Sequence, residues 1–189
     1  YADNGEIVVA MIDDEATVKR YFRENFGYEQ EILWIPDVFG YSAQLPQIMR
    51  KSGVKYFPTI KMSWNSVNKF PHSTFRWKGL DGSEILTHMP PEGNYNSAVR
   101  PESLLATAQK FRESNIDNRA MLLFGIGDGG GGPGREHLER LRREKCLVGL
   151  PQTKQAFAID FFRDIDLDRK KFPQYAGELY LEKHQGTYT

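Results

Sequence analysis

The sequence contains one cysteine, Cys146, so no disulfide bond can form within the chain. A protein without internal disulfides suits a reducing compartment, and we expect a cytoplasmic location. No run of about 18 apolar residues is present, which predicts that the chain has no transmembrane helix. The first residues also lack a basic stretch followed by an apolar core, so no signal peptide is expected, although a removed leader remains open because the chain begins with Tyr1.

The chain also lacks an excess of either charge. Lys and Arg together number 25, and Asp and Glu together number 25, so the formal net charge is zero. This balance argues against a surface that binds nucleic acid or another polyanion. The 189 residues are enough for one domain with a hydrophobic core. Aromatic residues make up 13%, which suits a carbohydrate site and equally suits an ordinary core.

Hydrophobic periodicity and turn residues predict strands and helices in alternation, with no internal repeat. We expect strands over residues 7–12, 31–35, 56–62, 75–79, 84–88, 120–124 and 178–182. We expect helices over residues 13–25, 43–51, 102–113, 135–145 and 155–164. Asp81-Gly82 predicts a hairpin turn between residues 75–79 and 84–88. The alternation predicts an α/β fold with a parallel sheet and crossover connections.

The segment from Leu33 to Ser42 brings a carboxylate into an aromatic turn. An apolar run ends in Pro36-Asp37, and Phe39, Gly40 and Tyr41 follow. Aromatic faces beside an acid are typical of a sugar site, where the rings pack on the sugar and the carboxylate does the chemistry. The alternative for Asp37 is a turn-forming or helix-capping role, which is common for an Asp after Pro.

A second acid, Asp128, lies in a glycine-rich loop that follows the apolar run 121–124. The glycines Gly125, Gly127 and Gly130 fit the G-x-G-x-x-G pattern of a dinucleotide site. Asp128 argues against that interpretation, because it places a negative charge where a pyrophosphate would bind. No clear ribose-binding acid follows about twenty residues later. We expect Asp37 and Asp128 to follow neighbouring parallel strands and to open into one cleft.

Four blocks of sequence carry a resemblance to a known family. They read WIPDVFGYSAQLPQIM over 34–49, KMSWNSVNKFPHSTFRWKGLDGSEILTHMPP over 61–91, LLFGIGDGGGGP over 122–133 and GELYLEKHQGTYT over 177–189. In order and spacing they resemble the class II α-mannosidases of glycoside hydrolase family 38, and the neutral, cytosolic-type branch above all. Residues 1–27 match less well.

The resemblance implies that residues 1–189 form one partial catalytic domain, part of a seven-stranded β/α barrel. It also implies an enzyme that removes terminal α-mannose from mannose-containing oligosaccharides with retention of configuration. Asp37 stands at the position of the nucleophile, which also binds the catalytic zinc, and Asp128 stands at the general acid/base. Their carboxyl groups are then expected about 5–5.5 Å apart. The resemblance settles neither linkage specificity nor oligomeric state.

Further residues lie in blocks that face the sugar in the family. We expect substrate contacts from Phe39, Lys61, Trp64, Tyr95 and His184, with ordinary packing as the alternative for each. Trp64 and Tyr95 are candidates for stacking on the sugar or for binding its hydroxyls. Lys61 stands where other branches have Arg, so it is expected to hold a sugar hydroxyl or the Asp37 carboxylate.

Zinc is the point at which the sequence departs from the family, whose members bind it through two His and two Asp. The first pair comes from an H-x-D motif, and none of the four histidines here is followed two places later by Asp; His72 and His88 are expected to be structural. The chain offers only Asp37 of the four ligands, and one carboxylate cannot hold zinc tightly. We therefore expect either a fragment of a longer enzyme or an inactive relative that binds sugar or another partner.

Overall fold

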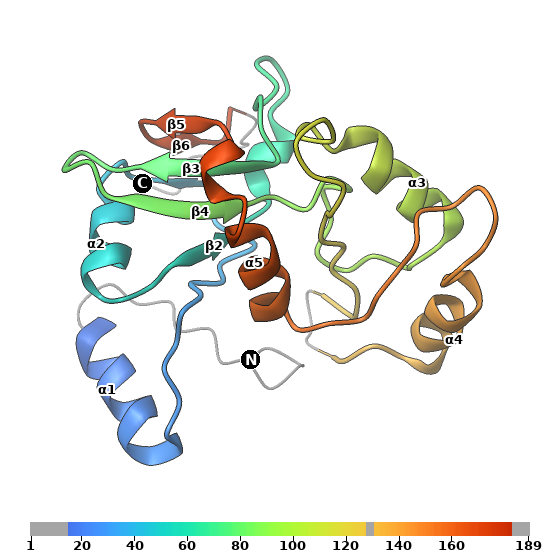
Figure 1. The fold of residues 1–189 in the computed structure, drawn as a ribbon, viewed down its shortest axis with the longest axis horizontal. Helices are drawn as coiled ribbons and strands as arrows, with labels where there is room; N and C mark the ends of the chain where they lie inside the picture. The colour runs from blue at the N-terminus through green and yellow to red at the C-terminus, as the bar shows by residue number, and fades with distance from the viewer. Residues whose placement is uncertain (1–14, 128–130, 183–189) are drawn as a thin grey trace.

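The structure is a computed structural model that describes residues 15–127 and 131–182. A four-stranded sheet lies at its centre, with helices on both sides (Figure 1). In spatial order its strands are β2 (Tyr56–Pro58), β4 (Glu84–His88), β3 (Thr74–Lys78) and β5 (Gln174–Ala176). A second, antiparallel sheet joins β1 (Gly40–Tyr41) to β6 (Leu179–Tyr180). The predicted strand over 7–12 lies outside the described residues.

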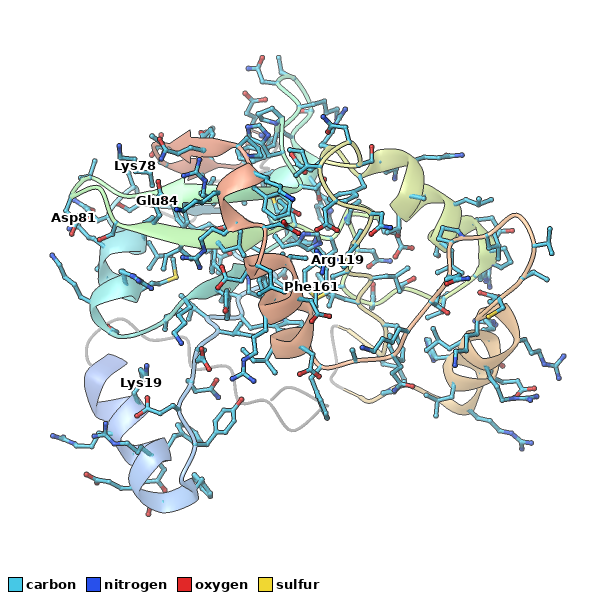
Figure 2. All side chains as sticks on the ribbon, in the orientation of Figure 1. Lys19, Lys78, Asp81, Glu84, Arg119 and Phe161 are labelled. Carbon is cyan, nitrogen blue, oxygen red and sulfur yellow. The ribbon has the colours of Figure 1, made fainter. Side chains whose placement is uncertain are left out.

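The hairpin predicted around Asp81-Gly82 is confirmed. Strands β3 and β4 pair antiparallel, with Lys78 opposite Glu84 and Asp81 at the tip between them (Figure 2). Gly82 has φ +86°, a conformation that favours glycine because it has no side chain to clash. The Asp81 carboxylate accepts a hydrogen bond from the backbone N–H of Ser83 at 2.9 Å, which closes the turn.

The predicted parallel sheet is correct only in part, because this hairpin makes the sheet mixed. β2 is parallel to β4 and β3 is parallel to β5, but β3 runs antiparallel to β4. A short turn between consecutive strands can only join antiparallel neighbours, whereas parallel pairs need longer crossovers. The described residues thus show a mixed α/β fold, and the seven-stranded barrel stays a prediction.

The helices occur where the periodicity placed them, with some ends shifted. They are α1 (Glu15–Phe26), α2 (Leu45–Lys51), α3 (Pro101–Lys110), α4 (Arg135–Glu144) and α5 (Ala158–Asp166), with short 3₁₀ turns η1 (Lys61–Trp64) and η2 (Arg169–Lys171). Pro46 lies in the first turn of α2, and Gly27 and Gly53 follow their helices with positive φ. Residues 111–113 and 155–157 were predicted helical and are not. In the part of the chain that the structure describes, no helix is long and apolar enough to cross a membrane.

Both faces of the sheet are covered, which explains why β4 is buried along most of its length. Ile85 packs with Phe57, Trp77 and Met49 of α2 on one face. Its neighbour Leu86 points to the other face, where it belongs to a buried cluster with three residues of α5: Ala158, Phe162 and Ile165. In Figure 1, α2 and α5 lie beside the sheet, α1 extends away from it, and α3 and α4 lie on the far side from α2.

Three predicted strands differ most from the structure, and the one predicted over 178–182 is shortened to Leu179–Tyr180. Residues 31–35 contribute only one bridge, from Ile32 to Tyr56, and residues 120–124 contribute only one, from Phe124 to Ser97. The strand predicted over 56–62 ends at Pro58, because the chain turns at Ile60 into the 3₁₀ turn η1.

Candidate active site

The Asp37 turn follows a segment that runs parallel to β2. Ile32 bridges Tyr56 in parallel orientation, and the backbone N–H of Leu33 donates to the Tyr56 carbonyl at 3.1 Å. Since β2 is in turn parallel to β4, the chain leaves all three segments at the same edge of the sheet. This is the edge at which α/β barrels carry their catalytic groups. Asp37 follows the segment that contains Ile32, and Lys61 follows β2, so both residues lie at this edge.

Two buried hydroxyls fix the backbone just before Asp37. The Tyr41 hydroxyl donates to the carbonyl of Ile35 at 2.7 Å and lies 2.8 Å from Thr59 Oγ1. Burial raises the pKa of Tyr41 well above its usual range, and the nearby negative charge of Asp37 raises it further. Tyr41 therefore stays protonated at neutral pH and keeps donating to Ile35. The turn that carries Asp37 is thus tied both to β1 and to the end of β2.

The Asp37 carboxylate is paired with a buried lysine. Lys61 Nζ lies 2.5 Å from Asp37 Oδ1, and the Lys61 side chain is only 4% exposed. The Asp37 side chain is 51% exposed, so the carboxylate reaches open space while one oxygen is held. A charge-assisted hydrogen bond of this kind fixes the orientation of the carboxylate.

Aromatic rings surround the Lys61 ammonium. Its Nζ lies 3.3 Å from the ring centroid of Trp64, 5.3 Å from that of Phe39 and 5.8 Å from that of Tyr95. All are within the range of a cation–π interaction. The structure therefore brings five of the predicted site residues together around one charge pair: Asp37, Phe39, Lys61, Trp64 and Tyr95.

The loop that leads to Asp128 passes against the same group. Asp128 itself lies outside the described residues, as does His184. Gly127 packs so closely on Tyr95 that an added Cβ would lie 2.7 Å from Tyr95 Cε2. The glycine at this position therefore has a packing reason that needs no bound nucleotide. The preceding segment is held by the Ser97 N–H, which donates to the carbonyl of Leu123 at 3.0 Å.

His88 lies beneath this edge, fully buried at the end of β4. The backbone N–H of Met121 donates to His88 Nε2 at 3.2 Å, so the ring proton is assigned to Nδ1, which donates to Thr74 Oγ1 at 2.8 Å. The ring also packs edge-on against Phe161 of α5, with centroids 4.8 Å apart. Burial lowers the pKa of His88 to about 3. This neutral ring joins β3, β4 and the segment that leads to Asp128.

We expect this histidine to make the fold sensitive to acid. The pKa of His88 is about 3 in the folded state and 6.5 in its ordinary state, so the unfolded chain binds the extra proton between these values. Its contribution to the free energy of unfolding is complete above pH 6.5 and is lost as the pH falls toward 3. By pH 4.5 the loss should be about 2–3 kcal/mol. Urea unfolding at pH 7 and pH 4.5 measures this loss. Between these pH values, the free energy of unfolding should fall less in His88→Gln than in the unsubstituted protein. Equal losses in both proteins would contradict this assignment.

Comparison with known proteins decides the family. The model of the N-terminal domain of glycosyl hydrolases family 38 matches residues 4–178. The chain belongs to glycosyl hydrolase family 38. Alpha-mannosidase G of Dictyostelium discoideum is 44% identical over 171 residues, which cover 90% of this chain and 16% of that protein. Human alpha-mannosidase 2C1 is 43% identical over 180 residues, which cover 95% of this chain and 17% of that protein.

A solved structure shows the same fold. The crystal structure of an alpha-mannosidase from Enterococcus faecalis V583 superposes with a TM-score of 0.59 at 16% identity, over 83% of this chain and 19% of that one. The chain therefore spans less than a fifth of the length of these relatives. Two LexA repressors, from Caldicellulosiruptor saccharolyticus and Alkaliphilus oremlandii, are 75% identical over only 24 residues, which is too short a match to show a family.

The described residues of this family 38 chain do not fit a zinc ion. Within 15–127 and 131–182, no group of three or more His, Cys, Asp or Glu side chains is placed to hold a metal. At Asp37 one carboxylate oxygen already contacts the Lys61 ammonium, and a single carboxylate offers too few ligands for a tetrahedral site. What these residues can do chemically is to present an oriented carboxylate beside aromatic faces.

Sequence reasoning missed two residues that hold this site. Tyr41 and Thr59 touch no expected substrate position, yet their hydroxyls fix the carbonyl of Ile35. Tyr41 belongs to the same aromatic turn as Asp37, but the sequence around it does not indicate that its hydroxyl donates to the carbonyl of the preceding segment. Thr59 lies in a stretch that was predicted to be a continuous strand, which hid its position at the strand end.

Proposed function

We propose that this chain is the part of a retaining exo-α-mannosidase that carries the nucleophile, and that the enzyme removes terminal α-mannose from oligosaccharides. The observation that carries the proposal is the half-exposed Asp37 carboxylate, held by Lys61 at the aromatic-lined edge of the sheet in a family 38 chain. A glycosidase nucleophile must be oriented and open to the sugar, and the Lys61 contact and the exposure of the Asp37 side chain support both.

In this mechanism Asp37 attacks the anomeric carbon and forms a covalent mannosyl-enzyme, while Asp128 protonates the departing oxygen. Asp128 then takes a proton from water, which attacks the same carbon and frees mannose with its configuration retained. Tyr95 supports the role of Asp128, because it touches both the Lys61 group and the loop that leads to Asp128. Phe39 is the aromatic face proposed to contact the sugar, and His184 remains a proposed substrate contact.

We propose further that zinc binds only in a longer polypeptide, in which other ligands join Asp37. The relatives are about six times as long as the matched segment, which leaves ample chain to supply them. The single exposed cysteine suits a reducing compartment, and we propose a cytoplasmic location for the enzyme. Its substrates would be mannose-containing oligosaccharides.

The experiment compares residues 1–189 with a polypeptide of the relatives' length. We expect the short chain to hydrolyse no aryl α-mannoside and to bind no stoichiometric zinc, because one carboxylate is too few ligands. The longer protein should do both. Hydrolysis rates and zinc content by atomic absorption are the measurements.

Two results would contradict the proposal. A zinc-loaded, active short chain would mean that its ligands lie within 1–189 after all. A longer protein that binds mannosides without hydrolysing them would favour the rival reading, a sugar-binding module that has lost catalysis.

A further inference from the structure

The indole of Trp64 was predicted to stack on the sugar or to bind its hydroxyls, and one of its two faces is occupied by a side chain of the protein. The Lys61 ammonium lies 3.3 Å from the Trp64 ring centroid, closer than to either other ring of the site. A cation at this distance over an aromatic face is strongly attracted to the ring electrons. A sugar cannot stack on that same face while the ammonium is there.

The local backbone explains why the two side chains meet. Lys61 and Trp64 are the first and last residues of η1, and side chains three apart in a 3₁₀ turn lie one above the other. The turn is closed by the N–H of Ser63, which donates to the carbonyl of Ile60 at 2.9 Å. The early end of β2 at Pro58 is therefore what aligns the lysine with the indole.

A second contact fixes the plane of the indole. Trp64 Nε1 donates to the carbonyl of Gly93 at 2.9 Å, from the loop that follows β4. The ring is thus held by its own turn on one side and by a neighbouring loop on the other. Although Trp64 is 45% exposed, its orientation is set by these two contacts.

We propose that Trp64 is a positioning residue, whose indole face holds the Lys61 ammonium against Asp37. This inference rests on the proposed function, because it assigns Trp64 a part in placing the nucleophile. A lysine side chain is long and flexible, so holding its ammonium in one place costs conformational entropy. An aromatic face attracts the ammonium without the full charge of a second carboxylate, which would compete with Asp37 for it. Asp37 is then held at one oxygen and stays open to the sugar.

The first test is spectroscopic and needs no activity. In residues 1–189, protons above an indole face resonate upfield, so the ε-methylene protons of Lys61 should be shifted upfield in two-dimensional NMR spectra. Trp64→Leu should return them to ordinary lysine values, and Trp64→Phe should keep part of the shift. Ordinary values in the unsubstituted chain would overturn the proposal, whether or not the enzyme reading is correct.

The second test separates positioning from stacking in the longer, active polypeptide. Trp64→Leu should lower kcat about 10-fold with little change in KM, because a loosely held nucleophile slows the chemical step. Trp64→Phe, which keeps an aromatic face, should restore most of this loss. In a protein that already carries Lys61→Met, adding Trp64→Leu should lower kcat little further, because the ammonium that Trp64 positions is absent.

A matched control is Phe157→Leu, which removes another half-exposed aromatic ring, at the residue that precedes α5. Its kinetics should stay unchanged. A rise in KM with kcat preserved in Trp64→Leu, equal with and without Lys61, would instead assign Trp64 to sugar stacking and overturn the proposal. Inactivity of the unsubstituted longer protein would count against the proposed function, while the NMR result would still decide whether Trp64 holds Lys61.

Discussion

Asp37→Asn should abolish α-mannoside hydrolysis in the longer polypeptide, with kcat/KM falling by about 10⁴-fold or more. The substitution keeps the shape of the side chain but removes the charge that attacks the anomeric carbon. It also removes the charged partner of Lys61, whose side chain is 4% exposed. The measurement is the initial rate on an aryl α-mannoside, with circular dichroism to confirm that the fold persists.

Asp81→Asn is the matched control for this substitution. Asp81 lies at the tip of the β3–β4 hairpin, where it pairs with Lys51 at 3.2 Å, and an asparagine can make the same turn hydrogen bond to Ser83. Its activity should equal that of the unsubstituted protein. Substantial hydrolysis by a folded Asp37→Asn protein would remove Asp37 from the nucleophile role.

Asp128→Ala should have an effect that depends on the leaving group. Natural oligosaccharides leave as poor alkoxides that need a proton, so their kcat/KM should fall by about 10²–10⁴-fold. Activated aryl mannosides, such as the dinitrophenyl compound, leave without protonation, so formation of the mannosyl-enzyme should be much less affected. Pre-steady-state rates on both substrate types are the measurement.

Adding azide gives a further check on Asp128. A small anionic nucleophile needs no general base, so it should restore turnover of the activated substrate in Asp128→Ala and yield mannosyl azide. Equal losses on both substrate types, with no rescue, would mean that another group supplies the proton.

The parts of the fold that the sequence predicted well are those fixed by local chemistry. Pro46 and Gly53 mark the two ends of α2, and Asp81-Gly82 makes the hairpin turn whatever surrounds it. The strands that were predicted wrongly are segments whose structure depends on partners distant in the sequence. The N–H of Met121, for example, donates to the buried ring of His88 rather than to a neighbouring strand, and no local pattern can reveal that.

The candidate site shows the same division between local and distant effects. Sequence and family resemblance selected Asp37, Lys61 and Trp64, and the structure brings these three side chains together. The pattern could not predict how these side chains are arranged, because the arrangement depends on a 3₁₀ turn that begins within a stretch predicted as strand. The role of the Tyr41 hydroxyl was not predicted for a similar reason, since its hydrogen-bond partners come from two other segments.

The most direct test of the account is to trap the covalent intermediate. A fluorinated α-mannosyl fluoride forms the mannosyl-enzyme quickly and releases it slowly, so the labelled longer protein can be digested and sequenced by mass spectrometry. We predict one labelled peptide, with the fluoromannosyl group on Asp37 and one label per active site. A label on a different carboxylate, or steady hydrolysis of natural substrate with inverted configuration and no label, would contradict the assignment of Asp37 as the nucleophile.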